Sequence, residues 1–156
     1  MKSRPEREFE QDPAVIRKVA MDCLARREHG VQELGAKLLA KGYAAQPVEA
    51  ALAGLLADNL LSDARFTEAF VHARFQRGSG PQKIRAELRQ RGIDESLIDG
   101  CLGVYDGQWQ VLAGEVRTRK YGADGPADFR ERSRQMRFLQ QRGFTAEQIT
   151  AAFRDE

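Results

Sequence analysis

Three short segments of the chain share one pattern, in which apolar and polar residues lead to a cation, a glycine and a large apolar residue. They read LLAKGY at 38–43, ELRQRGI at 87–93 and FLQQRGF at 138–144. A helix usually stops at a glycine because the residue after its cap takes a left-handed conformation, which glycine adopts without penalty. The sequence therefore predicts the same helix ending three times, at the structural glycines Gly42, Gly92 and Gly143.

In this ending, the Schellman motif, the residue after the glycine packs against the residue five positions before it. The three pairs are Tyr43 with Leu38, Ile93 with Leu88, and Phe144 with Leu139. All three are apolar, as the motif requires. A Lys or an Arg precedes each glycine, where a cation faces the negative end of the helix dipole.

The similarity extends beyond the helix ends. The first two copies align without a gap at a shift of 50, which matches Gly30 with Gly80 and Leu34 with Ile84. The third copy lies 51 residues further on and keeps its second half, with Gln135 at the position of Leu34 and Ile84. A period of this length predicts tandem repeats that are each too small to bury an apolar face alone.

Apolar residues recur with a helical period along the chain, and no segment alternates as a strand does. We therefore expect an all-α protein made of three tandem three-helix repeats, at residues 13–61, 62–106 and 107–156. Residues 1–12 are charged and aperiodic, which is typical of a flexible N-terminal arm. Ser62 is expected to cap a helix, and Thr145 with Gln148 to form a capping box.

The composition excludes several classes of protein. No run of eighteen apolar residues exists and the first residues are charged, so we expect no signal peptide and no membrane span, and a cytoplasmic location. Cys23 and Cys101 are too few for a metal cluster and are expected to be buried. His29 and His72 lack partners at metal or triad spacing, so we expect no metal, no cofactor and no enzymatic activity.

Basic residues gather in two parts of the chain. Residues 72–91 are rich in Arg and Lys against a single acid, Glu87, and residues 117–137 carry a second group. Arginine suits phosphates and carboxylates alike, although such residues can also simply solvate helix faces. The candidate contact residues are Arg74, Arg77, Lys83, Arg85, Arg89, Arg130, Arg134 and Arg137. No segment resembles a base-reading helix, and Phe66, Phe70 and Phe75 are expected in the core rather than stacked on bases.

The segment LLSDARFTEAFVHARFQRGSGPQKIRAELRQRGI, at 60–93, resembles the RecX family of bacterial regulators of the RecA recombinase. The flanking segments LARREHGVQELGAKLLAKGY and MRFLQQRGFTAEQI extend the likeness to about residues 14–154. Its most specific features are the Leu-x-Asp-x-x-Phe opening of the second repeat, the Gly-x-Gly-Pro break and the three glycines in order.

The resemblance implies an elongated, curved modular array of three-helix units that binds the RecA–DNA filament. Such a protein inhibits the ATPase, strand exchange and recombinase activity of RecA, without catalysis of its own. It implies the RecA filament as partner, and we expect single-stranded DNA as a further one. We also expect no membrane contact and a monomeric chain. The alternatives are a non-specific single-stranded DNA-binding protein that competes with RecA for DNA, and a helical scaffold for another partner.

Overall fold

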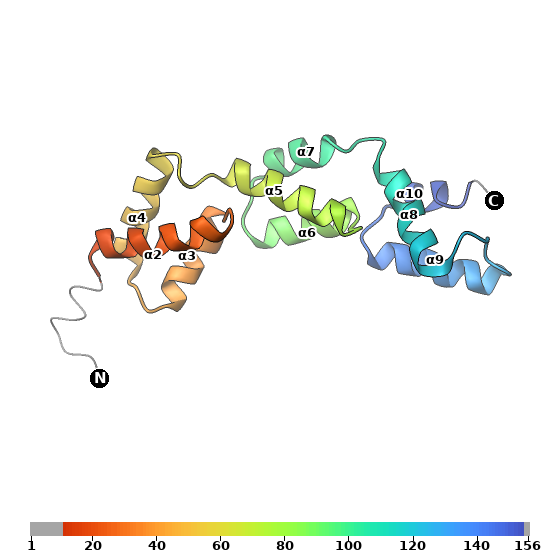
Figure 1. Cartoon of the computed structure of the whole chain (residues 1–156), viewed down its shortest axis with the longest axis horizontal. Helices are drawn as coiled ribbons and strands as arrows, with labels where there is room; N and C mark the ends of the chain where they lie inside the picture. The colour runs from red at the N-terminus through yellow and green to blue at the C-terminus, as the bar shows by residue number, and fades with distance from the viewer. Residues whose placement is uncertain (1–10, 155–156) are drawn as a thin grey trace. The chain divides into compact units, whose positions relative to one another are not determined.

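A computed structural model describes residues 11–154. Within these residues the chain forms nine α-helices and no strand. Figure 1 shows the order of the helices along the chain. The helices are α2 (Pro13–Arg26), α3 (Val31–Ala40), α4 (Ala45–Ala57), α5 (Asp63–Gln76), α6 (Pro81–Gln90), α7 (Glu95–Gly103), α8 (Trp109–Tyr121), α9 (Phe129–Gln141) and α10 (Ala146–Ala151). The predicted all-α class is confirmed. The expected N-terminal arm, residues 1–12, lies outside the described residues except for its last two.

The helices follow one another as three trios, α2–α4, α5–α7 and α8–α10, and the limits of the corresponding domains stay a prediction. The chain divides into two compact units. Unit 1 comprises Met1–Thr67 with Arg91–Ile93, and unit 2 comprises Glu68–Gln90 with Asp94–Glu156. In the part of the chain that is described, each helix is too short or too polar to cross a lipid bilayer.

The core of unit 1 forms where α2, α3 and α4 each contribute one apolar stripe. Its members are Ile16, Ala20, Leu34, Leu38, Val48, Ala51, Leu52, Leu55 and Leu61. They recur at four residues in α2 and α3. In α4 they recur at three or four, with Ala51 and Leu52 adjacent, so they lie on one side of each helix, and Leu61 follows α4. Each fully buried Leu or Ile stabilises the folded state by about 1.5–3 kcal/mol relative to leaving it exposed. No single helix could bury such a stripe alone, so the three depend on one another.

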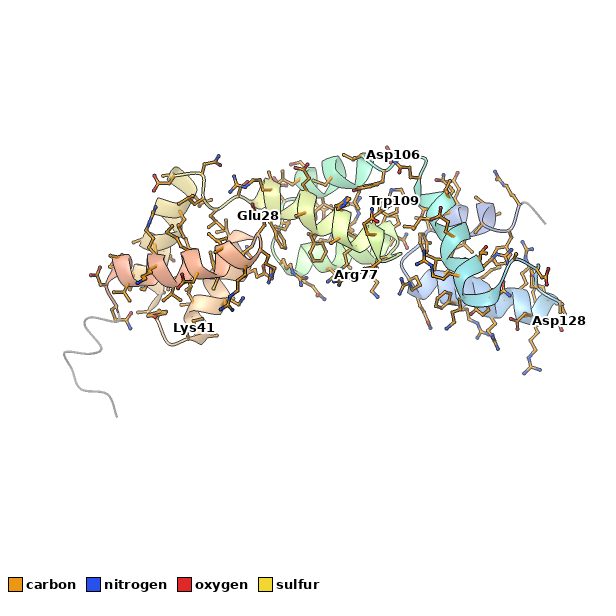
Figure 2. The ribbon with its side chains drawn as sticks, in the orientation of Figure 1. Glu28, Lys41, Arg77, Asp106, Trp109 and Asp128 are labelled. Atoms are coloured by element: carbon orange, nitrogen blue, oxygen red, sulfur yellow. The ribbon has the colours of Figure 1, made fainter. Side chains whose placement is uncertain are left out.

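Unit 2 repeats this spacing. Its buried apolar residues include Ile84 and Leu88 of α6, Ile98 and Leu102 of α7, Leu112 and Val116 of α8, Leu139 of α9, Ile149 of α10, and Phe144 and Phe153. Beside them, Phe75 stacks on Tyr105 with ring centroids 4.3 Å apart and meets Trp109 edge-on at 5.3 Å. Trp109, labelled in Figure 2, is buried at the start of α8. Phe70 and Phe75 of this unit are half-buried, whereas Phe66, which belongs to unit 1, is buried as predicted.

The predicted helix endings are confirmed. Gly42, Gly92 and Gly143 have φ angles of +100°, +72° and +100°. At two of them both Schellman hydrogen bonds are present. The amide of Tyr43 donates to the Leu38 carbonyl at 3.4 Å and that of Phe144 to the Leu139 carbonyl at 3.2 Å, and the glycine amides donate to Leu39 and Gln140. Gly78 and Asn59 end α5 and α4 in the same way, and the Asn59 ending is one that the sequence pattern did not predict.

The helix starts agree with the predicted caps. Ser62 Oγ accepts from the Arg65 amide at 3.2 Å, and Thr145 with Gln148 forms a complete capping box. The prediction that both cysteines are buried is wrong, because Cys23 and Cys101 are free thiols of intermediate exposure. Each lies at the margin of its apolar stripe, where a helix face turns toward solvent. Burial nevertheless raises the pKa of the Cys101 thiol, with the Glu68 carboxylate acting in the same direction.

Within unit 2 the start of α6 and the end of α9 are joined through their backbones. The amides of Gly80 and Gln82 donate to the carbonyls of Arg142 and Gly143 at 2.7 and 2.9 Å. A Cβ at Gly80 would lie 2.3 Å from the Gly143 carbonyl carbon, so only glycine permits this approach. The Arg142 side chain adds a hydrogen bond of 2.6 Å to the Arg77 carbonyl. These contacts fix the positions of the basic residues on α6 and α9.

Candidate interaction surface

The basic residues of α6 are largely neutralised by acids of α7. The Arg85 guanidinium pairs with Glu95 at 2.9 Å and with Asp99 at 2.7 Å, and Arg89 donates to the other oxygen of Glu95. The hydrogen bond from Arg89 lowers the pKa of the Glu95 carboxyl despite some desolvation, so this acid stays ionised. Lys83 is exposed on the same helix, with no ion pair to any described acid. The sequence places these cations close together on one helix but cannot show their partners on α7.

Arg74 and Arg77, near the end of α5, also differ in whether an acid pairs with them. Arg74 pairs with Glu87 at 2.9 Å and lies 4.6 Å from the centroid of the Phe70 ring. Its side chain is three-quarters buried, which makes the ion pair partly structural. Arg77, labelled in Figure 2, is exposed and forms no ion pair within residues 11–154. Of the five candidates from Arg74 to Arg89, the structure therefore leaves the charges of Arg77 and Lys83 uncompensated.

The candidates on α9 form a single row. Arg130, Arg134 and Arg137 follow one another at four and three residues, which places them on one face of the helix. All three are exposed. Arg134 approaches Glu131 at 3.6 Å with 64% of its side chain accessible, and neither Arg130 nor Arg137 pairs with a described acid. Leu139 and Gln135 are buried on the opposite face. The structure thus brings together the three residues that sequence spacing alone had left as separate candidates.

An aromatic pair beside this row contacts one of its cations, Arg134, and Lys120 of α8. Tyr121, the last residue of α8, meets Phe138 of α9 edge-on with ring centroids 5.6 Å apart. The Lys120 ammonium lies 4.8 Å from the Phe138 ring, and the Arg134 guanidinium lies 5.6 Å from the Tyr121 ring. The spacing of residues did not predict this arrangement. The only signal in the sequence was the Lys-Tyr pair at the end of a helix.

The second basic group of the sequence does not lie on one surface. Arg117 is only 5% exposed and donates from Nη1 to Gln135 Oε1 at 3.1 Å. The guanidinium groups of Arg117 and Arg132 lie 4.6 and 4.7 Å from the centroid of the Phe153 ring. These two arginines therefore hold the C-terminal part of unit 2 together. Periodicity could have indicated the burial of Arg117, because it continues the spacing of Trp109, Ala113 and Val116 along α8.

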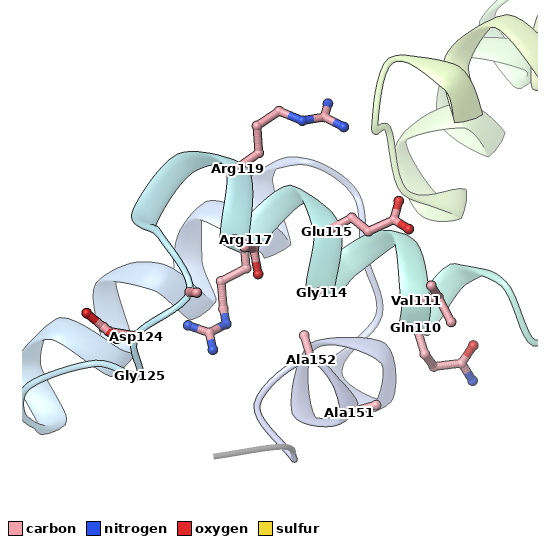
Figure 3. A pocket seen from close by; sticks show the side chains of 12 residues that line it. Gln110, Val111, Gly114, Glu115, Arg117, Arg119, Asp124, Gly125, Ala151 and Ala152 are labelled. Atoms are coloured by element: carbon pink, nitrogen blue, oxygen red, sulfur yellow. The ribbon is translucent and has the colours of Figure 1, made fainter.

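A pocket of 1040 Å³ lies between α8, the loop that follows it, and α10. Figure 3 shows the small residues Gly114, Ala151 and Ala152 along it, while the Arg119 side chain extends away. Its lining includes Glu115, Arg117 and Thr118 but, among the described residues, no His or Cys.

His29 has a structural environment in unit 1. Its side chain is 1% exposed, with Nδ1 3.1 Å from the Arg27 carbonyl and Nε2 3.2 Å from the Lys37 ammonium. A carbonyl only accepts and an ammonium only donates, so the imidazole is neutral and carries its proton on Nδ1. Burial lowers the pKa of His29, and the Arg27 and Lys37 charges act in the same direction. Across residues 11–154, no group of three or more His, Cys, Asp or Glu residues could hold a metal ion.

The three-helix trios and the basic surfaces of unit 2 define an all-α tandem-repeat protein with exposed cationic faces. Family models confirm the resemblance that the sequence suggested. The second three-helix domain of RecX matches residues 62–102, the third matches 108–153 and the first matches 17–55. The chain belongs to the RecX family.

Curated relatives and solved structures agree with this assignment. The regulatory protein RecX of Halorhodospira halophila is 46% identical over 137 residues, which cover 88% of this chain and 85% of that protein. The regulatory protein RecX of Pseudomonas syringae pv. tomato is 44% identical, with 88% of both chains covered. The crystal structure of RecX from Lactobacillus salivarius superposes with a TM-score of 0.77 at 19% identity, covering 92% of this chain and 96% of that one. At 19% identity, this likeness shows only that the two chains share the all-α tandem-repeat fold.

Proposed function

We propose that this protein binds the RecA–DNA nucleoprotein filament and inhibits the ATPase, strand exchange and recombinase activity of RecA. In this way it would modulate recombination and DNA repair. The observation that carries the proposal is the match of all three RecX domains, in order, to residues 17–153. Relatives that are 44–46% identical over most of their length are named regulatory proteins RecX.

The chemistry of the described surface supports a function in binding. Arg77, Lys83, Arg130 and Arg137 are exposed and have no acidic partner among residues 11–154. Such cations can meet carboxylates of a protein filament or phosphates of the DNA inside it. Arg74, Arg85 and Arg89 remain candidates too, but an incoming acid would have to displace Glu87, Glu95 or Asp99.

Steady-state ATP hydrolysis by RecA filaments preformed on single-stranded DNA tests the proposal. Addition of this protein is expected to lower the rate until the filament is saturated. A matched control replaces Lys18, Arg26 and Lys41 by Gln, because these exposed cations of unit 1 form no ion pair with a described acid. An unchanged rate at saturating wild-type protein contradicts the proposal.

The alternative is a protein that binds single-stranded DNA non-specifically and competes with RecA for it. The exposed arginine row on α9 favours this reading, because phosphate binding needs only accessible cations. Titration with bare DNA and with preformed filaments separates the two functions. Tighter binding to the filament supports the RecA-directed function, whereas equal affinity for bare DNA supports competition.

We further infer that the protein is a monomer and acts in the cytoplasm, where RecA filaments assemble. Sedimentation equilibrium should then give a mass near the 17.5 kDa of one chain over the concentrations used in the ATPase assay. A concentration-dependent increase toward twice that mass contradicts a monomer.

A further inference from the structure

The row on α9 has the geometry of a linear binding site. Arg130, Arg134 and Arg137 are spread along about 10 Å of the helix at a rise of about 1.5 Å per residue. Gln141 continues the row by one turn and is exposed as well. The buried side chains of Gln135 and Leu139 anchor the opposite face. The helix is therefore held in place while its row of guanidinium groups faces solvent.

Aromatic rings, rather than carboxylates alone, lie against two of the cations beside α9. On α6, carboxylates position Arg85 and Arg89 and at the same time neutralise them. Beside α9, the faces of Phe138 and Tyr121 lie under Lys120 and Arg134. An aromatic face attracts a cation through its quadrupole without adding a negative charge. Glu131, at 3.6 Å from Arg134, is the one described acid that pairs with this group, and Arg134 remains 64% accessible. Lys120 and the α9 row therefore form a positioned surface on which cations outnumber acids.

We propose that this α9 basic face, defined as Lys120, Arg130, Arg134 and Arg137, binds the sugar-phosphate backbone of single-stranded DNA. A row of like charges at regular intervals matches a polymer that carries one phosphate per nucleotide. This inference assigns the nucleic-acid contact of the proposed function to one surface. It rests on the proposed function only where RecA ATPase inhibition is measured.

Fluorescence anisotropy with a labelled oligodeoxythymidine tests this assignment. The variant R130Q/R134Q/R137Q should bind more weakly than wild type, and its dependence on salt should be shallower. Single strands lose about 0.7 in the slope of log Kobs against log salt per phosphate contact, so three contacts change the slope by about 2. Between 50 and 200 mM salt, the wild type should therefore lose roughly twentyfold more affinity than the variant does.

Two further variants keep the result unambiguous. R130K/R134K/R137K retains the charges and should keep the wild-type salt slope, because a lysine binds phosphate as a point charge. K18Q/R26Q/K41Q removes three exposed charges from unit 1 and should leave both affinity and slope near wild type. Circular dichroism at 222 nm confirms that each variant is as helical as the wild type.

RecA ATPase measurements on the same variants distinguish failure of this inference from failure of the proposed function. If R130Q/R134Q/R137Q binds DNA like wild type, the inference is overturned. If that variant has also lost ATPase inhibition, the face contacts carboxylates of RecA instead, and the proposed function stands. If wild-type protein does not bind the oligonucleotide even at 50 mM salt, the inference is again overturned, and inhibition of the ATPase decides the proposed function separately.

Discussion

Alanine at each of the three helix-end glycines should destabilise the protein to different extents, although the three endings share one backbone conformation. At Gly42 a Cβ would meet nothing within 4 Å, so the loss is limited to backbone strain at φ +100°. At Gly143, which has the same φ, a Cβ would lie 2.4 Å from Lys83 Cβ and 2.7 Å from the Lys83 amide nitrogen. At Gly92 it would overlap the end of the flexible Gln32 side chain, which can move aside.

The magnitudes follow from these environments. A side chain in the left-handed region costs about 1–2 kcal/mol, which applies to Gly42→Ala and Gly92→Ala. Gly143→Ala adds the cost of overpacking against a helix backbone, about 1–3 kcal/mol more. We therefore expect a loss of about 1 kcal/mol at residues 42 and 92 and about 3 kcal/mol at residue 143. A β-branched residue at position 92 should cost at least about 1 kcal/mol for the same reason.

Urea unfolding can report on the two units separately. Trp109 is the only tryptophan of the chain and is buried in unit 2, so its fluorescence follows that unit, whereas circular dichroism follows all helices. Gly143→Ala should lower the midpoint seen by fluorescence well below that of wild type. Gly42→Ala should leave the fluorescence midpoint unchanged and shift only the circular dichroism signal. Equal losses at residues 42 and 143 would refute the role assigned to the contact with Lys83.

Three other predictions concern stability. Gly80→Ala should destabilise the protein by about 2–4 kcal/mol because its Cβ would clash with the Gly143 backbone. Gly100→Ala, in open space on α7, should instead stabilise it by about 0.5–1 kcal/mol. Thermal melting measures both changes. The pKa of His29 in the folded protein lies below its unfolded value of 6.5, so unfolding binds a proton. The free energy of unfolding should therefore fall as the pH drops from about 6.5 through the lowered pKa. His29→Gln should flatten this part of a pH series of urea midpoints. Thr145→Ala removes the cap of α10 and should cost about 1 kcal/mol in urea unfolding, and a loss no larger than that of an exposed Thr150→Ala would contradict the capping role.

Local features of the fold could be predicted from the sequence because they depend on neighbouring residues. The endings at Gly42, Gly92 and Gly143 are decided within six residues, and the capping box at Thr145 within four. The all-α class followed from apolar spacing within each helix. These are short-range effects of backbone conformation and periodicity, which a sequence displays directly.

The candidate surface depended instead on contacts between distant residues. Arg85 and Arg89 looked available in the sequence, but acids of the following helix neutralise them. Arg117 looked like part of a basic patch, but it is buried against Gln135, eighteen residues away. Helix packing decides which cations are exposed without an acidic partner. The local pattern of residues does not contain that information.

The buried hydrogen bond between Arg117 and Gln135 means that the three repeats are not interchangeable. Leu34 and Ile84 fill the corresponding position in the first two repeats with hydrocarbon, whereas the third repeat uses an amide that accepts from a guanidinium. A chimera that carries Leu at position 135 but keeps Arg117 would remove the acceptor of this hydrogen bond. Natural variation at these two positions should therefore be correlated.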